Sequence, residues 1–179
     1  HLDKLLPAPT KIAKVTHHPA LAYEKVGDFM SALRNRGGLA ARALEFTILT
    51  AARSGEVRGA TWDEIDLIKR LWIVPAERMK MRRDHEVPLS DAAISILNAL
   101  PRTDEPYLFP GARGNKPMSD MTLSKVIRRM GDQTTTVHGF RSTFRDWAAE
   151  TTAYSREVVE MALAHTIGNK TEEAYRRGN

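Results

Sequence analysis

The spacing of apolar residues predicts a chain built mainly from helices. Apolar side chains recur every three or four positions from Tyr23 to Asn35, and a more continuously apolar segment over 39–52 follows two glycines. The same reasoning predicts a short helical turn over 54–59. It predicts longer helices over 90–100, 119–130, 139–151 and 155–163, and from residue 171 onward.

Three short segments rich in β-branched and aromatic residues interrupt the helices, over 60–66, 71–75 and 85–89. A small antiparallel three-stranded sheet is the simplest arrangement, with Lys80 near the turn that joins the last two strands. The predicted fold class is therefore α+β and mostly helical. A short buried segment is expected over 107–109. The three tryptophans are expected in the core or against the sheet, at Trp62, Trp72 and Trp147.

The first 22 residues differ from the rest because they hold Pro7, Pro9 and Pro19 and show no apolar period. We expect residues 1–22 to be a linker and residues 23–179 to form one domain. The length and the 42% hydrophobic content suit a single buried core. The chain starts at His1 rather than at a methionine, which suggests a fragment of a longer protein.

Composition restricts the chemistry. The net charge of +5 and the pI of about 9.6 favour an anionic partner such as nucleic acid or an acidic membrane surface, although a basic protein without such a partner fits equally well. The absence of cysteine excludes disulfides, thiolate catalysis and Cys-ligated zinc. No apolar run reaches membrane-spanning length and no signal pattern precedes the domain, so we expect a cytoplasmic protein without membrane contact.

Two arginines stand out as candidate phosphate ligands. Arg53 follows the apolar segment, and Glu56 lies three residues on, where its carboxylate can hold the guanidinium; Arg58 is expected to face solvent. His138 and Arg141 are three residues apart at the start of a predicted helix, whose free N–H groups favour an anion. Taken singly, an Arg–Glu pair or a capping histidine is more often structural.

A basic turn supplies the third candidate. Lys80 lies between Arg78 and the pair Arg82 and Arg83, and a lysine beside a phosphodiester is a reasonable general acid. The arginines are candidates for contact with the DNA backbone, or form a solvated turn.

His165 and Tyr175 complete the set near the end of the chain. His165 closes an apolar helix, and Tyr175 is followed by two arginines, where positive charge favours a phenolate or a phosphate. Each residue alone also fits a structural role. Together with Arg53, Arg141 and His138, they suggest phosphoryl transfer with a protein nucleophile, without an acidic cluster for Mg²⁺. His17 and His18 lack a carboxylate partner, so we assign them no role.

The order of these motifs resembles the catalytic domain of the tyrosine recombinase (phage integrase) family, of the P4 type. The similarity covers about residues 23–177 and runs through Ala-Ala-Arg53-Ser-Gly-Glu56, Trp62-Asp-Glu-Ile-Asp66, Lys80, His85-Glu-Val-Pro-Leu-Ser90, His138-Gly-Phe-Arg141, Leu-Ala-His165 and Ala-Tyr175-Arg176. The chain departs from many members at Ala164, where they have glycine, and at Met79 and Met81, which flank the lysine.

The resemblance assigns roles to the candidates. It implies that Tyr175 is the nucleophile and Lys80 the general acid, and that Arg53 and Arg141 bind the scissile phosphate. His138 and His165 assist, and Glu56 supports Arg53. It also implies double-stranded DNA attachment sites as substrate, self-association to a tetramer on DNA, no metal or other cofactor, and a bacterial or phage-encoded protein associated with the nucleoid.

Three other functions fit the same residues. A topoisomerase of type IB has the same site but reseals the original strand. A non-catalytic DNA-binding module keeps only the basic surface. A metal-dependent nuclease that uses His138 and His165 is the least favoured reading.

Overall fold

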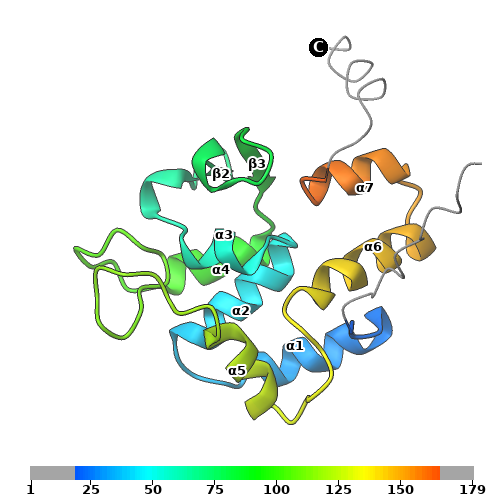
Figure 1. Cartoon of the computed structure of the whole chain (residues 1–179), viewed down its shortest axis with the longest axis horizontal. Helices are drawn as coiled ribbons and strands as arrows, with labels where there is room; N and C mark the ends of the chain where they lie inside the picture. The colour runs from blue at the N-terminus through cyan, green and yellow to red at the C-terminus, as the bar shows by residue number, and fades with distance from the viewer. Residues whose placement is uncertain (1–18, 166–179) are drawn as a thin grey trace, which may run out of the picture.

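The computed structural model describes residues 19–165 and shows helices around a small sheet (Figure 1). The described elements are the 3-10 turn η1 (Tyr23–Lys25), α1 (Val26–Arg34), α2 (Leu39–Thr50), α3 (Ser54–Arg58), the turn η2 (Trp62–Glu64), β1 (Ile65–Asp66), β2 (Leu71–Val74), the turn η3 (Ala76–Arg78), β3 (His85–Pro88), α4 (Asp91–Ala99), α5 (Thr122–Arg129), α6 (Gly139–Thr151) and α7 (Arg156–Ala162). The mostly helical α+β fold is confirmed. The helix predicted from residue 171 lies outside the described residues.

Helix α2 is the centre of the core, as its apolar sequence predicts. It contacts α1, α3, α4 and α5, and its Leu44 and Phe46 are fully buried. One carboxylate lies among these apolar groups: Glu45 is 3% exposed and pairs with Arg34 at 2.7 Å and Arg42 at 2.5 Å. A buried carboxylate is tolerated only when such partners offset its desolvation. The α2 core therefore holds the end of this helix, where Arg53 follows, in a fixed position.

The sheet is three-stranded and antiparallel, in the order β1-β2-β3, as predicted. Trp72 and Val74 of β2 are buried while Ile73 between them is exposed, so one face of the strand packs on the core. Val74 pairs with His85 at the end of the hairpin where the connection between the two strands begins. The connection that follows Val74 therefore leaves the sheet and carries Lys80.

The segment 60–66 is mostly a turn, so the strand predicted over its whole length is wrong. Only Ile65–Asp66 pair with β2, and Trp62–Glu64 form η2. The Thr61 hydroxyl donates to the Glu64 carboxylate at 3.0 Å, which closes the turn locally. A threonine followed three residues later by glutamate favours a helical turn over a strand, and this pairing outweighs the strand preference of the flanking residues.

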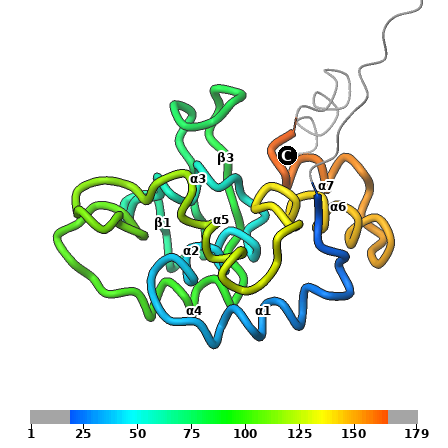
Figure 2. The backbone as a smooth tube through the Cα atoms, turned by 60° about the horizontal axis from the view of Figure 1, so that its bottom comes forward, coloured from blue at the N-terminus to red at the C-terminus, as the bar shows by residue number. Residues whose placement is uncertain are grey.

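Helices α6 and α7 lie next to each other beside the sheet-bearing part, on the right in both views (Figures 1 and 2). They enclose a separate apolar cluster in which Ala148, Val159 and Leu163 surround Ala51, the residue that follows α2. This cluster brings the end of α7 to the end of α2, although the two are far apart in the sequence.

The chain before α1 packs against α6. The Pro19 carbonyl accepts hydrogen bonds from the Thr136 backbone at 3.2 Å and hydroxyl at 3.3 Å, and the Leu21 carbonyl accepts from Thr143 at 2.6 Å. A Cβ atom on Gly139 would lie 2.2 Å from the Pro19 oxygen, which explains why glycine follows His138. Residues 1–18 of the expected linker lie outside the described part of the chain.

The tryptophans differ in their environments. Trp72 is fully buried, as expected, and Trp62 packs against the core and under the Arg102 guanidinium, 3.5 Å from its ring centroid. Trp147 is 42% exposed, so the core position predicted for it is wrong. It lies on the outer side of α6, where only Phe144 is recorded as a ring partner in the described residues.

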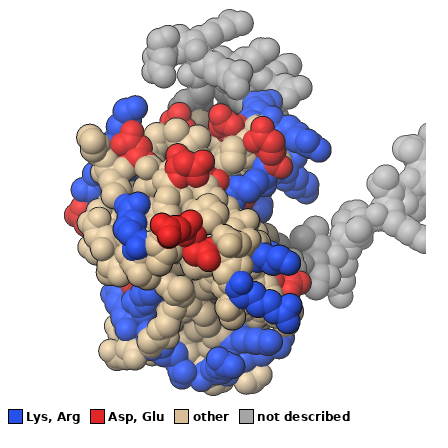
Figure 3. All heavy atoms as spheres, turned by 90° about the vertical axis from the view of Figure 1, so that its left-hand side faces the viewer, with Lys and Arg blue, Asp and Glu red and all other residues tan. Residues whose placement is uncertain are grey.

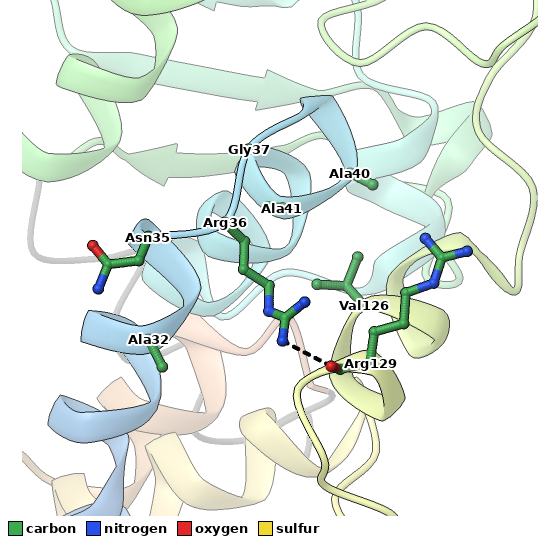
Figure 4. A pocket seen from close by; sticks show the side chains of 8 residues that line it. All are labelled: Ala32, Asn35, Arg36, Gly37, Ala40, Ala41, Val126 and Arg129. Atoms are coloured by element: carbon green, nitrogen blue, oxygen red, sulfur yellow. Dashed lines mark hydrogen bonds between the residues drawn. The ribbon is translucent and has the colours of Figure 1, made fainter.

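A cavity between α1, α2 and α5 lies apart from the predicted site residues (Figure 4). Arg36 crosses it and donates to the carbonyl oxygen of Arg129 at 2.7 Å. This bond satisfies a carbonyl at the end of α5 and places positive charge at its negative end. The cavity is lined by Ala32, Asn35, Arg36, Gly37, Ala40, Ala41, Val126 and Arg129, a set without a carboxylate or an imidazole.

Candidate functional site

The first part of the candidate site is the short link between α2 and α3. Ala51 ends α2 in the left-handed conformation, with φ of 49°, and so turns the chain sharply before Arg53. The Glu56 carboxylate accepts from the Arg53 backbone at 2.8 Å and from its guanidinium at 2.7 Å. Glu56 is 4% exposed, whereas the Arg53 side chain is 26% exposed. The pairing predicted from the sequence is present, and it holds a guanidinium at the protein surface.

Arg141 is the second guanidinium, and it lies almost entirely inside the protein. It is 4% exposed and donates to the carbonyl oxygens of Ala51 and Leu163, so it joins α2, α6 and the end of α7. Burial, and next the nearby Arg53, lower the pKa of Arg141 to about 10, which leaves it charged at neutral pH. Its Nε is buried without a hydrogen-bond partner among the described residues.

His165 lies directly beside Arg141. Its Nε2 is 3.2 Å from Nη2 of Arg141, and its Nδ1 is 2.5 Å from the Glu160 carboxylate. The residue before it, Ala164, has φ of 49°, and its carbonyl oxygen accepts from Arg53 at 3.3 Å. Arg53, Arg141 and His165 thus belong to one hydrogen-bonded network, although they come from three separate parts of the sequence.

Lys80 is brought to Arg53 by the connection between β2 and β3. Both residues line one open depression, together with Glu56 and Arg82. Met79 beside it is 4% exposed and anchors this connection in the core, while Lys80 itself is exposed. The buried Met79 side chain therefore fixes the backbone from which the exposed Lys80 side chain extends.

The arginines of this connection differ in their surroundings. Arg78 donates to the Glu56 carbonyl oxygen at 2.8 Å and pairs with the Glu64 carboxylate, and its side chain is 24% exposed. Arg82 and Arg83 are exposed. Arg78 thus holds the connection against α3, while Arg82 and Arg83 extend outward. Arg58, expected to face solvent, is instead partly buried and donates to the Met118 carbonyl at 2.8 Å.

His138 lies at the N-terminus of α6, one turn before Arg141, and it is exposed. The loop before it is ordered by Asp132, whose carboxylate accepts from the backbones of Thr134 at 2.8 Å and Thr135 at 2.9 Å. Burial alone would raise the pKa of Asp132, but the hydrogen bonds from Thr135 and Thr134 outweigh it and lower the pKa to about 2. The ionised Asp132 therefore fixes the approach to His138.

His85 is a neighbour of the site to which sequence reasoning gave no role. Burial lowers the pKa of His85, and the charges of Arg141 and Arg53 lower it further. The charge of Glu56 and a hydrogen bond with the Ala162 backbone raise it. These influences place the β3 histidine near both guanidiniums and near the end of α7. The sequence pointed to His85 only through its place in the motif 85–90, and that motif does not predict which residues His85 contacts.

Tyr175, the predicted nucleophile, lies outside the described residues, as do His17 and His18. Within residues 19–165, no group of three or more histidine or carboxylate side chains is arranged to hold a metal ion. No helix in that range is long and apolar enough to cross a membrane.

Comparison with known proteins identifies the class. The chain belongs to the phage integrase family, whose model matches residues 20–179. It is 37% identical over 182 residues to the integrase of Enterobacteria phage P4, with 90% of this chain and 42% of that protein covered. It is 34% identical over 167 residues to prophage integrase IntA of Escherichia coli K12, with 90% of this chain and 40% of IntA covered. The chain thus spans about two fifths of these relatives.

Solved structures show the same fold. The integrase of transposon Tn1549 in complex with circular intermediate DNA matches with a TM-score of 0.68 and 16% identity, over 97% of this chain and 64% of that one. The catalytic core of lambda integrase matches with a TM-score of 0.61 and 18% identity, over 86% of this chain and 95% of that one. The described fold is therefore that of a tyrosine recombinase catalytic core.

Proposed function

We propose that this chain is the catalytic part of a site-specific DNA recombinase that cleaves and rejoins DNA through a 3′-phosphotyrosyl intermediate. The observation that carries the proposal is the network joining Arg53, Arg141 and His165, with Lys80 in the same depression as Arg53. Two guanidiniums, an imidazole and a lysine suit a phosphodiester that gains negative charge in the transition state. Family membership supports the same chemistry.

In this proposal, the Tyr175 hydroxyl attacks the phosphorus atom: its oxygen forms a new bond to the phosphate, and its proton passes to His165. The bond to the 5′ oxygen breaks, and that oxygen leaves as a hydroxyl after taking a proton from Lys80. The energy of the broken bond is kept in the phosphotyrosyl link, so a 5′ hydroxyl of a second strand reverses the step without an external energy source. Two such exchanges integrate or excise a DNA element.

The two arginines differ in what they contribute. Arg53 is partly exposed and held by Glu56, so its guanidinium is free on one side to approach a phosphate oxygen without losing its orientation. Arg141 is buried and bound to two carbonyl oxygens. Its proposed role is therefore to supply positive charge behind the phosphate and to align His165. Direct contact with the phosphate falls chiefly to Arg53 and to His138 at the N-terminus of α6.

Double-stranded DNA is the proposed partner, and four copies of the chain are proposed to act together on it. One lambda integrase structure, 17% identical and with a TM-score of 0.62, is a tetramer bound to a Holliday junction. Arg82 and Arg83 next to Lys80 are proposed to contact the DNA backbone. On the face turned left in Figure 1, acidic side chains lie in the upper half, and basic side chains lie around and below them (Figure 3).

The test is covalent trapping on nicked duplexes with random sequence around the nick. Cleavage near the nick releases a short strand, so the covalent complex accumulates and its DNA can be sequenced. We expect protein–DNA adducts that survive denaturation and form in EDTA. A DNA-binding module gives none, and a metal-dependent nuclease gives cleavage without an adduct, and only when EDTA is left out. Exchange between two marked duplexes of the recovered sequence then separates a recombinase from a topoisomerase, which only reseals its own strand.

A further inference from the structure

Glu160 carries an inference that goes beyond the residues already assigned. Its carboxylate is 2.5 Å from Nδ1 of His165, and its side chain is only 17% exposed. Among the described residues it also pairs with Arg156, at 4.0 Å, but Arg156 is 89% exposed. The described contacts therefore direct the Glu160 carboxylate at the imidazole rather than at a surface ion pair.

The backbone explains why the two side chains meet. The His165 N–H donates to the Glu160 carbonyl at 2.9 Å, and the Ala164 N–H donates to the Met161 carbonyl at 2.9 Å. With Ala164 in the left-handed conformation, these two bonds form the Schellman motif that ends α7. The motif folds the chain back on the last turn of the helix, so His165 lies over Glu160.

The contacts of His165 define its tautomer. Arg141 is a protonated guanidinium and has only hydrogens to offer, so the atom beside it, Nε2, must accept. A neutral imidazole carries its single hydrogen on the other nitrogen, and Nδ1 faces a carboxylate that accepts it. Both neighbours therefore favour the Nδ1–H tautomer, with the lone pair of Nε2 directed at the arginines.

We propose that Glu160 is a positioning residue for His165. The carboxylate holds the imidazole in the Nδ1–H tautomer and so keeps Nε2 unprotonated; Nε2 accepts from Arg141 in the described structure and takes the phenolic proton when the hydroxyl of the attacking tyrosine replaces that contact. Once that proton has moved to Nε2, the carboxylate stabilises the resulting imidazolium against Arg141 and Arg53. In hydrolases a carboxylate orients a catalytic histidine in the same way, through a hydrogen bond to its Nδ1–H. The role in cleavage rests on the proposed function, whereas the tautomer does not.

The first test needs no DNA. Nitrogen-15 NMR of the chain with labelled histidine, recorded at pH 8, distinguishes the two neutral tautomers, and His165→Gln identifies the signal. We expect His165 in the Nδ1–H form in the unaltered chain and in Glu160→Gln, whose amide oxygen still accepts, and a mixture in Glu160→Ala. Glu157→Gln removes the same charge three residues earlier on α7 and should leave the tautomer unchanged. The proposal is overturned if His165 is in the Nε2–H form in the unaltered chain, or if its tautomer does not change in Glu160→Ala.

The second test measures cleavage on a nicked duplex recovered by trapping. Glu160→Gln should slow covalent capture by about 10- to 100-fold, with DNA affinity unchanged, because the charge is lost while the hydrogen bond remains. In a His165→Gln background the same change should have less than about a twofold effect, since Glu160 acts through His165. An equal loss in both backgrounds shows a merely structural role and overturns the proposal. Absence of adducts with the unaltered chain contradicts the proposed function instead, and the NMR result still decides the tautomer.

Discussion

The Arg141 guanidinium, on α6, donates a hydrogen bond to the carbonyl oxygen of Ala51, ninety positions earlier in the sequence. Ala51 is left-handed, so its carbonyl turns away from the helical direction of α2 and toward Arg141. A second carbonyl, that of Leu163, is bound by the same guanidinium. Arg141 therefore joins three segments of the fold and also aligns His165, so it is a structural and a functional residue at once.

Arg141→Lys should lower the free energy of unfolding by about 2 kcal/mol, because an ammonium group cannot span both carbonyl oxygens and leaves one buried and unpaired. Urea unfolding followed by circular dichroism measures the change. Arg145→Lys is the matched control, since this side chain lies on the same helix and is 42% exposed. Its effect should stay within about 0.5 kcal/mol. Equal stability of the two variants would show that the Arg141 bonds do not hold the fold.

Ala164→Gly should stabilise the chain by about 0.5–1 kcal/mol. Alanine at φ of 49° carries a steric cost that glycine avoids, and the gain is reduced by the greater freedom of glycine in the unfolded chain. Ala149→Gly, at an exposed position inside α6, should instead destabilise by about the same amount. Thermal unfolding of both variants tests the opposite signs. Destabilisation by both would contradict the left-handed assignment at Ala164.

Stability should fall in acid partly through Asp132. Its pKa is lowered to about 2 from an ordinary value of 3.8, so its contribution is complete above pH 4 and is lost as the pH falls toward 2. Because Asp132 is partly exposed, solvent screening reduces this contribution to about 1 kcal/mol. Urea unfolding at pH 7 and at pH 3 should give a smaller difference for Asp132→Asn than for the unaltered chain. An identical pH dependence would contradict the loop contacts.

Lys80→Ala should slow cleavage by about 100-fold or more if the lysine protonates the leaving oxygen. Replacing that oxygen by sulfur should restore most of the rate, since a thiolate leaves without a proton. Single-turnover trapping on both duplexes measures the ratio. Arg82→Ala should weaken DNA binding and lower its salt dependence, yet show no selective rescue by sulfur. A Lys80→Ala defect that persists on the sulfur substrate would remove the lysine from the general-acid role.

The sequence predicted those parts of the fold that depend on local pattern. Helix α2, the sheet and the Arg53–Glu56 pair follow from apolar spacing and from residues three apart. The η2 turn was missed because the Thr61–Glu64 bond outweighs strand preference. The contact of Glu160 with His165 was not foreseen, since it requires the left-handed turn at Ala164 that no periodicity reveals. The bonds of Arg141 to Ala51 and Leu163 are tertiary, so they were beyond the reach of spacing rules.

In the proposed reaction, the Tyr175 oxygen becomes bonded to DNA. The chain has four tyrosines, and the described ones offer clear alternatives. Tyr154 is 68% exposed between α6 and α7, whereas the Tyr23 hydroxyl donates to Glu150 at 2.9 Å, a bond that raises the pKa of Tyr23 to about 12. Tyr154→Phe is therefore the matched control for any substitution of Tyr175.

The most direct measurement is mass spectrometry of the DNA-linked peptide from the trapped complex, repeated with Tyr175→Phe and Tyr154→Phe. We expect the adduct on Tyr175 in the unaltered chain and in Tyr154→Phe. Tyr175→Phe should bind the duplex with unchanged affinity and form no covalent complex. An adduct that still forms in Tyr175→Phe, or that maps to another residue, would contradict the account.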